Sequence, residues 1–71
     1  MSTPTTVSFT VNDEPATGAG VTVGALVDER AESRKGVAVA VDADVVPRSE
    51  WDERFVADGE AVDILTAVQG G

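Results

Sequence analysis

The end of the chain carries the residues that best suit chemistry. Residues 66–71 contain no charged side chain and finish in two glycines, Gly70 and Gly71. A terminal diglycine has two interpretations. It is either an unstructured end, because termini are often disordered and glycine tolerates disorder, or a slim extension that carries the terminal carboxylate along a narrow channel into a partner's active site. The choice depends on whether the other residues form a domain that presents such a tail.

The length and composition indicate one small domain that spans residues 1–71, with residues 1–6 as a frayed leader and residues 66–71 as a flexible tail, whose reactivity is one of the two interpretations above. Domains of this size often depend on disulfides or metal ions. The chain has no cysteine and no histidine, which excludes disulfides and argues against zinc or copper sites. We therefore expect no metal site.

No targeting or membrane segment is evident in the sequence. Every apolar run is far shorter than the ~20 residues that span a bilayer. The N-terminal residues lack the basic and apolar regions of a signal peptide. We therefore expect a cytoplasmic protein.

The charge of the chain excludes several classes of partner and activity. With 13 acidic and 5 basic residues, its formal charge of −8 argues against nucleic acid and against anionic membrane surfaces. The acidity is explained by solubility, by steering toward a basic partner or by a high-salt habitat, and these explanations stay open. Without cysteine or histidine the usual nucleophile–base pairs are missing, and the carboxylates fall mostly in turns and on polar faces. We therefore expect no enzyme.

Five stretches have the composition of β-strands. Residues 7–11 alternate apolar and polar, the period of a half-buried strand, and a turn cluster at 12–15 separates them from a weaker return strand. Valines alternate with alanines between Val37 and Val41, which predicts a central strand with another element packed closely on the alanine side. The predicted strands are residues 7–11, 16–20, 37–41, 45–46 and 61–65.

The last predicted strand has two distinct faces. Val62 and Ile64 point to one side, and Asp63 and Leu65 to the other. We expect the first pair to be buried under the helix and the second to lie on the opposite face, at the base of the tail. There, Leu65 is either a docking anchor beside Asp63, because apolar anchors dominate binding energy, or one of the scattered apolar residues found on any surface.

One helix is predicted at residues 23–31. Thr22 suits the N-cap, an apolar stripe follows it, and Gly36 is the stop signal. The stripe consists of Val23, Leu26 and Val27. Three basic residues cluster near the helix end, where positive charge suits the helix dipole. They are Arg30, Arg34 and Lys35. We interpret them as solvated, with a partner contact as the alternative.

A short helical turn is predicted after Pro47. The stretch Ser49-Glu50-Trp51-Asp52 has the spacing of a capping box. Trp51 and Phe55 are four residues apart and would share one face of a helix, so we expect both in the core. Asp58-Gly59 then signals a tight turn before the last strand.

The predicted order is strand, strand, helix, strand, strand, helical turn, strand, tail. This order indicates an α+β fold, in which one main helix lies across one face of a mixed sheet of four to five strands. The first and last strands are the most apolar, so we expect them near the centre of the sheet.

That element order resembles the β-grasp, or ubiquitin-like, fold. The residues are more specific, and over positions 6–71 they resemble the ThiS family of sulfur carriers of thiamine biosynthesis. The matching residues are Asn12-Asp13-x-Pro15, Thr22-Val23, Val45-Val46-Pro47-Arg48-x-x-Trp51, Asp58-Gly59 and Gly70-Gly71. The chain differs from the family in its longer leader, in Gly24 inside the helix and in the polar Gln69 of the tail.

The resemblance implies a mechanism. A separate activating enzyme, ThiF, uses ATP to adenylate the carboxylate of Gly71, and a sulfur donor enzyme then supplies the sulfur that replaces AMP. Thiazole synthase, ThiG, takes sulfur from the resulting thiocarboxylate. The carrier binds no cofactor of its own, Gly71 supplies the carbonyl carbon, and Gly70, Gln69 and Val68 form the tail.

Other functions remain open at this point. One is the small subunit of molybdopterin synthase, and another is a ubiquitin-like modifier that is joined to lysines. A third is a non-covalent β-grasp interaction module in which the diglycine is incidental.

Overall fold

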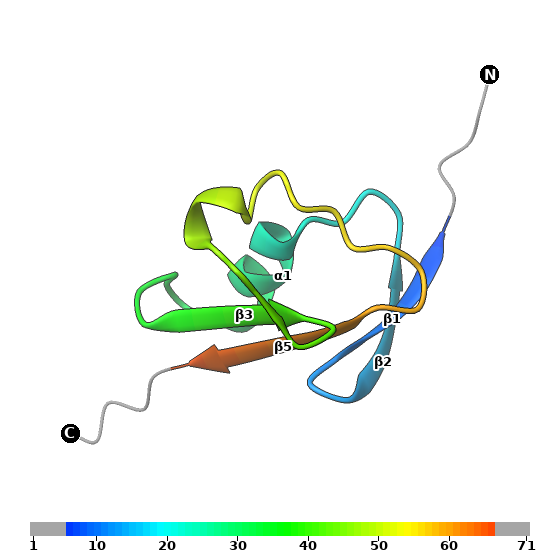
Figure 1. Cartoon of the computed structure of the whole chain (residues 1–71), viewed down its shortest axis with the longest axis horizontal. Helices are drawn as coiled ribbons and strands as arrows, with labels where there is room; N and C mark the ends of the chain where they lie inside the picture. The colour runs from blue at the N-terminus through cyan, green and yellow to red at the C-terminus, as the bar shows by residue number, and fades with distance from the viewer. Residues whose placement is uncertain (1–5, 67–71) are drawn as a thin grey trace.

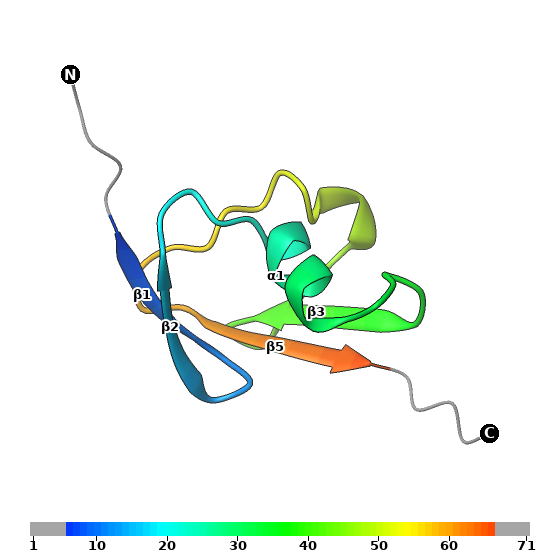
Figure 2. The same cartoon turned by 180° about the vertical axis from the view of Figure 1, so that it is seen from behind.

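The computed structural model describes residues 6–66, which form one mixed sheet with a single α-helix across one face (Figures 1 and 2). The elements are β1 (Val7–Val11), β2 (Glu14–Gly18), α1 (Val23–Arg30), β3 (Val37–Val41), β4 (Asp44–Val46), the 3₁₀-helix η1 (Arg48–Glu50) and β5 (Ala61–Thr66). The predicted α+β arrangement is confirmed.

The sheet has five strands in the order β2-β1-β5-β3-β4, so the last strand occupies the centre and the first lies next to it, as predicted. β5 runs parallel to β1 and antiparallel to β3. Thr66 pairs with Val37 and still belongs to β5. The prediction that the tail begins at residue 66 was therefore wrong by one residue, because pairing with β3 holds the strand past Leu65.

The β1–β2 hairpin is tighter than predicted. Asn12 and Asp13 have φ values of 52° and 69°, the left-handed geometry of a two-residue hairpin turn. β2 therefore begins at Glu14 rather than at residue 16. Pro15 lies inside β2, which accommodates it because β2 is an edge strand that needs no further hydrogen bond on its outer side.

The helix begins where the sequence predicted. Thr22 is the N-cap, and its Oγ1 accepts a hydrogen bond of 3.1 Å from the Ala25 amide. α1 ends at Arg30, one residue early, whereas Gly36 has a φ of 69° directly before β3 and does not end the helix. The predicted stripe and the inner face of β5 meet in one buried cluster that includes Val23, Leu26, Val27, Val62 and Ile64.

Only one of the two aromatic residues predicted for the core is buried. Trp51 is 1% exposed and donates a hydrogen bond of 3.0 Å from Nε1 to the Val46 carbonyl, whereas Phe55 is 55% exposed. The helical turn is a three-residue 3₁₀-helix without a side-chain cap, and Ser49 lies inside it. The capping box was therefore a wrong prediction, and without a continuous α-helix the two rings do not share a face.

Arg34 is paired rather than simply solvated, contrary to the first interpretation of the basic cluster, and the alternative of a partner contact stays a prediction. Arg34 Nη2 lies 2.9 Å from Asp28 Oδ2 and 2.9 Å from Asp52 Oδ1, so it ties α1 to the segment after η1. Gly24 in α1 lies next to the side chains of Arg34 and Asp52. A Cβ there would overlap the Asp52 carboxylate and lie 2.8 Å from Arg34 Nη2, so a larger residue at this position would displace the two side chains that form the ion pair.

The alanine side of β3 is bare, contrary to prediction. Val37, Val39 and Val41 are buried beneath α1, while Ala38 is exposed and Ala40 half-buried. Within residues 6–66 no second layer covers this face (Figures 1 and 2).

An ion pair braces the loop that leads into β5. Arg54 Nη2 lies 2.8 Å from Glu60 Oε2, and Glu60 Oε1 also accepts a hydrogen bond of 2.7 Å from the Ala57 amide. The Arg54 hydrogen bond is the main cause that lowers the pKa of Glu60, and burial opposes it. A carboxylate with a lowered pKa stabilises the fold above its unfolded pKa, and this contribution is lost as the pH falls through the folded value.

We therefore expect Glu60→Gln to flatten the acid side of the stability curve. The wild type should lose more free energy of unfolding than the variant as the pH falls below about 4.5, by less than ~1 kcal/mol because Arg54 is partly solvated. Urea denaturation at several pH values measures this difference. The lowered pKa values of Asp28 and Asp52 affect both proteins equally, and parallel curves would contradict the expectation.

Candidate functional site

The structure places the root of the predicted reactive tail. Gly71, Gly70, Gln69 and Val68 lie outside the described residues, so their predicted roles stay predictions. The last described residue, Thr66, ends the central strand and pairs with the first residue of β3. The terminal segment is therefore attached to the most enclosed strand of the sheet, and Figure 1 shows β5 ending beside the start of β3.

Asp63 and Leu65 lie on the sheet face opposite α1, as predicted. Their neighbours Val62 and Ile64 are buried at 0% and 6% exposure, whereas Leu65 is 66% exposed and Asp63 half-buried. The alternation of a β-strand produces this difference, because successive side chains point to opposite faces.

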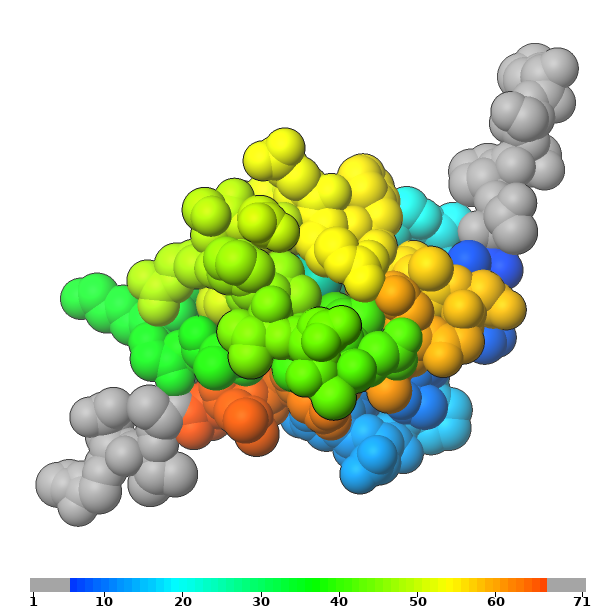
Figure 3. All heavy atoms as spheres, viewed as in Figure 1, coloured from blue at the N-terminus to red at the C-terminus, as the bar shows by residue number. Residues whose placement is uncertain are grey.

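The strand register extends this surface to β3 and β4. Ala38 lies beside Leu65, and Ala40 lies between Asp63 and Val45, which is 76% exposed. We call Ala38, Ala40, Val45 and Leu65 the open-face patch. In the space-filling view, the end of β5 lies at the surface just below β3 and β4 (Figure 3).

Sequence reasoning found Leu65 but missed the other members of this patch. Val45 was assigned only to a short strand, and the alanines of β3 were expected beneath another element. The signal was present in the strict valine–alanine alternation of β3, since small side chains on a bare face leave room for a partner's backbone as readily as for an element of the same chain.

A side chain completes the hydrogen bonding of β5 next to this surface. β1 and β5 pair through Thr10 and Val11, and the Asn12 amide donates a bond of 2.8 Å to the Val62 carbonyl. Asn12 then turns into the left-handed region. Its side-chain Oδ1 accepts a hydrogen bond of 2.8 Å from the Ile64 amide. The side chain thus supplies the acceptor that a backbone carbonyl would supply in a longer parallel ladder.

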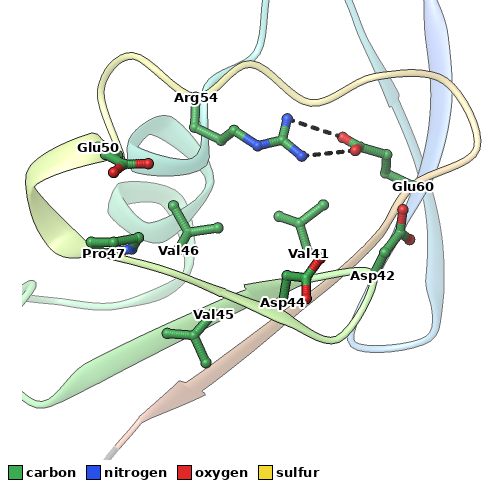
Figure 4. A pocket seen from close by; sticks show the side chains of 9 residues that line it. All are labelled: Val41, Asp42, Asp44, Val45, Val46, Pro47, Glu50, Arg54 and Glu60. Carbon is green, nitrogen blue, oxygen red and sulfur yellow. Dashed lines mark hydrogen bonds and ion pairs between the residues drawn. The ribbon is translucent and has the colours of Figure 1, made fainter.

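The domain's own polar groups offer no catalytic arrangement. An open hollow of about 260 Å³ beside β4 is lined by acidic residues, but its Arg54 and Glu60 bond to each other rather than point free side chains into it (Figure 4). In residues 6–66 no cluster of three acidic residues has metal-binding geometry. The resolved pKa shifts of Asp28, Asp52 and Glu60 are all downward, which is opposite to the shift that a general acid needs.

The described helices are also too short and too polar to cross a membrane.

Comparison with known proteins agrees with this geometry. The model of the ThiS family matches residues 5–71. The chain belongs to the ThiS family. Its members are sulfur carriers of thiamine biosynthesis, so the chain is a carrier protein and not an enzyme, as the sequence indicated. The bare sheet face and the diglycine end are therefore the surfaces to consider for function.

Two ThiS proteins illustrate the relationship. The sulfur carrier protein ThiS of Escherichia coli strain K12 is 32% identical over 53 residues, which cover 75% of this chain and 80% of that protein. The crystal structure of the thiamine biosynthesis protein ThiS from Geobacter metallireducens superposes with a TM-score of 0.71 at 30% identity, and covers 92% of this chain and 100% of that one. This similarity confirms the predicted β-grasp fold.

The Asn12 contact can be tested with two substitutions that both tolerate the left-handed backbone. Asn12→Asp keeps an Oδ1 acceptor, whereas Asn12→Gly removes it without straining the turn. A lost hydrogen bond is worth about 1 kcal/mol, so we expect the Ile64 amide of Asn12→Gly to exchange with solvent roughly fivefold faster. Hydrogen exchange measured by NMR provides the rates.

Asp13→Gly is the matched control, because it alters the same turn but leaves the Asn12 side chain in place. Its Ile64 amide should exchange at the wild-type rate, as should that of Asn12→Asp. Equal acceleration in Asn12→Gly and Asp13→Gly would show that turn stability, and not the side-chain acceptor, protects Ile64.

Proposed function

We propose that the chain carries sulfur as a thiocarboxylate on Gly71 and delivers it to the thiazole ring of thiamine. The observation that supports this best is the family match that extends to residue 71, in a chain whose diglycine is four residues beyond the end of the central strand at Thr66. The cytoplasm, where ATP is available, is the compartment that suits the reaction.

The reason for activation is chemical. A terminal carboxylate has a pKa of about 3.5 and is ionised near pH 7. Its negative charge resists nucleophilic attack, so one of its oxygens must first become part of a leaving group. The Gly71 carboxylate attacks the α-phosphate of ATP, which releases pyrophosphate and forms an acyl-adenylate. Hydrosulfide delivered by the donor enzyme then attacks the carbonyl carbon and displaces AMP, which leaves a thiocarboxylate at Gly71, and the thiocarboxylate passes its sulfur to the synthase.

The length of the tail supports a reaction at Gly71 inside a partner enzyme. Five residues follow Thr66, and a fully extended segment of that length spans at most about 18 Å at ~3.3–3.6 Å per residue. This span lets Gly71 enter a partner's active site while the folded domain stays outside. The chain contains no cysteine, so it has no thiol of its own to intercept the activated carbonyl.

The partners of this reaction are a ThiF-type adenylyltransferase, a sulfur donor enzyme and a ThiG-type thiazole synthase. We propose that the open-face patch, with Asp63 at its edge, docks the carrier on the adenylyltransferase. Leu65 is one residue from the end of β5 and 66% exposed. Docking through an apolar residue so close to the tail would set the distance between the start of the tail and the active site that Gly71 must enter.

The reactive end should depend on its length as strictly as on its residues. Deleting Gly71 withdraws the carboxylate by roughly 3.3–3.6 Å, an added alanine places the wrong atom in the nucleotide site, and Gly70→Val puts a branched side chain in the channel. Because a misplacement of ~1 Å costs about 100-fold, we expect all three variants to lose sulfur loading. Intact mass after incubation with ATP, activating enzyme and sulfur source detects the exchange of one oxygen for sulfur.

The folded domain is the internal control for these variants. Each should keep the wild-type melting temperature, because the changes lie beyond the last strand. Sulfur uptake by the protein that lacks Gly71 would place the chemistry elsewhere and overturn the proposal.

The docking role of Leu65 can be separated from general surface hydrophobicity. We expect Leu65→Asp to weaken binding to the adenylyltransferase about 10- to 30-fold, the scale of a central interface residue. Phe55→Asp is the matched control, since Phe55 is another exposed apolar residue but does not belong to the sheet. Calorimetric titration of both variants gives the affinities, and unchanged binding by Leu65→Asp would make Leu65 a scattered surface residue.

A further inference from the structure

Basic residues gather at the end of the molecule where β5 finishes. Arg30, Arg34 and Lys35 lie in the last turn of α1 or the loop that follows it, and that loop leads into Val37, the partner of Thr66. Arg48 joins them through a hydrogen bond of 3.1 Å from its Nη2 to the Arg34 carbonyl. Loop 31–36 and η1 lie at the same end of the domain as the tip of β5 in both views (Figures 1 and 2).

The opposite end of the molecule is acidic. Asp42 accepts a hydrogen bond of 2.9 Å from the Ala61 amide at the start of β5. Asp44 begins β4, and Asp58 and Glu60 lie in the loop before β5, where Arg54 is paired with Glu60. The charge is thus distributed unevenly along β5, with negative charge where the strand begins and most of the cations where it ends.

Only part of the positive charge is neutralised within the domain. In residues 6–66, Arg34 pairs with Asp28 and Asp52, and Arg54 pairs with Glu60. Arg48 and Lys35 form no ion pair there, although Glu32, Glu50 and Glu53 belong to the same end. That end is therefore mixed in charge, and what distinguishes it within residues 6–66 is three cations without a carboxylate partner, Arg30, Lys35 and Arg48. Of these, Lys35 belongs to loop 31–36, and Arg48 is bonded to that loop through the Arg34 carbonyl.

Arg48 is held in a defined position. Its guanidinium carbon lies 5.7 Å from the ring centre of Trp51, which is itself fixed by burial and by its bond to the Val46 carbonyl. A guanidinium has five N–H donors in a rigid fork, and here one donates to Arg34. An ordered cation loses little conformational entropy when it binds an anion, which makes it a good interface residue.

We propose that Arg48 and Lys35 form an electrostatic docking site for an acidic surface on the activating enzyme, beside the opening that admits the tail. This inference rests on the proposed function. The occupant is a carboxylate-bearing protein surface, because an unpaired guanidinium and an unpaired ammonium complement carboxylates, whereas the carboxylates at the opposite end of the carrier would be repelled by them. Complementary charge here both speeds association and orients the carrier with its tail toward the opening.

The test compares Arg48→Gln, Lys35→Gln and Ala19→Glu, each of which makes the net charge one unit more negative. Ala19 is exposed in the loop after β2, away from the tip of β5. ATP–pyrophosphate exchange gives the KM for the carrier at about 10 mM and about 1 M salt, where the Debye length is ~30 Å and ~3 Å. We expect a five- to tenfold increase in KM for the first two variants at low salt, little increase at high salt, and a less than twofold change for Ala19→Glu.

The outcomes separate this inference from the proposed function. A wild-type protein that never exchanges pyrophosphate or gains sulfur would contradict the proposed function. A wild type that is loaded normally, with variants that keep its KM at low salt, would overturn the docking site alone, as would an equal effect of Ala19→Glu. Because Arg48 packs on Trp51, the melting curve of Arg48→Gln shows whether that variant is folded. The Lys35 side chain has no bonding partner in the described domain, so Lys35→Gln decides the test if Arg48→Gln unfolds.

Discussion

β5 is hydrogen-bonded along both of its edges, parallel to β1 and antiparallel to β3, and its inner side chains Val62 and Ile64 are buried beneath α1. The strand cannot loosen without opening the sheet on two sides and exposing the centre of a small core. The terminal segment therefore starts from the most constrained part of the domain. Asn12 and β3 hold the strand almost to its last residue, so the position at which the terminal segment begins is well defined. The distance that Gly71 can cover from there depends on the number of residues after Thr66.

The same strand divides the molecule into two faces with different uses. The inner face is committed to the core, which in a domain of this size has little stability to spare. The outer face contributes nothing to that core and is therefore free to contact partners. Its small and apolar side chains stand out in a chain with 25% charged residues. A flat strip of alanines allows the backbone of a partner to approach closely, and the exposed Leu65 and Val45 provide the apolar area that such a contact would bury.

Sequence periodicity was sufficient for the strands and the helix because alternation and a 3.6-residue repeat follow directly from which side faces the core. It failed where tertiary contacts decided the outcome. The extent of β2 depended on the left-handed turn at Asn12, and the exposure of Phe55 depended on a 3₁₀-helix too short to align it with Trp51. The bond between Asn12 and Ile64 joins positions that are 52 residues apart, so no local pattern could reveal it. For the candidate site, the strand that bears it was predictable, whereas the ordering of Arg48 by Trp51 required the folded structure.

A carrier that brings no catalytic group must contribute position instead. The described carboxylates with resolved shifts have pKa values lowered by arginines, so they stay ionised and serve to brace loops. In the function we propose, the reacting carboxylate is that of Gly71, which is chemically ordinary, so its selection from every other protein carboxylate would have to come from the surface of the folded domain. In our proposals, apolar contact at the open-face patch would supply affinity with little directional preference. Arg48 and Lys35 would supply orientation, because they attract an acidic surface to one end of the carrier only. The open-face patch would therefore hold the carrier on the enzyme, and the cations near the end of β5 would orient it. Both contacts would be needed to bring the carboxyl carbon of Gly71 to the nucleotide site.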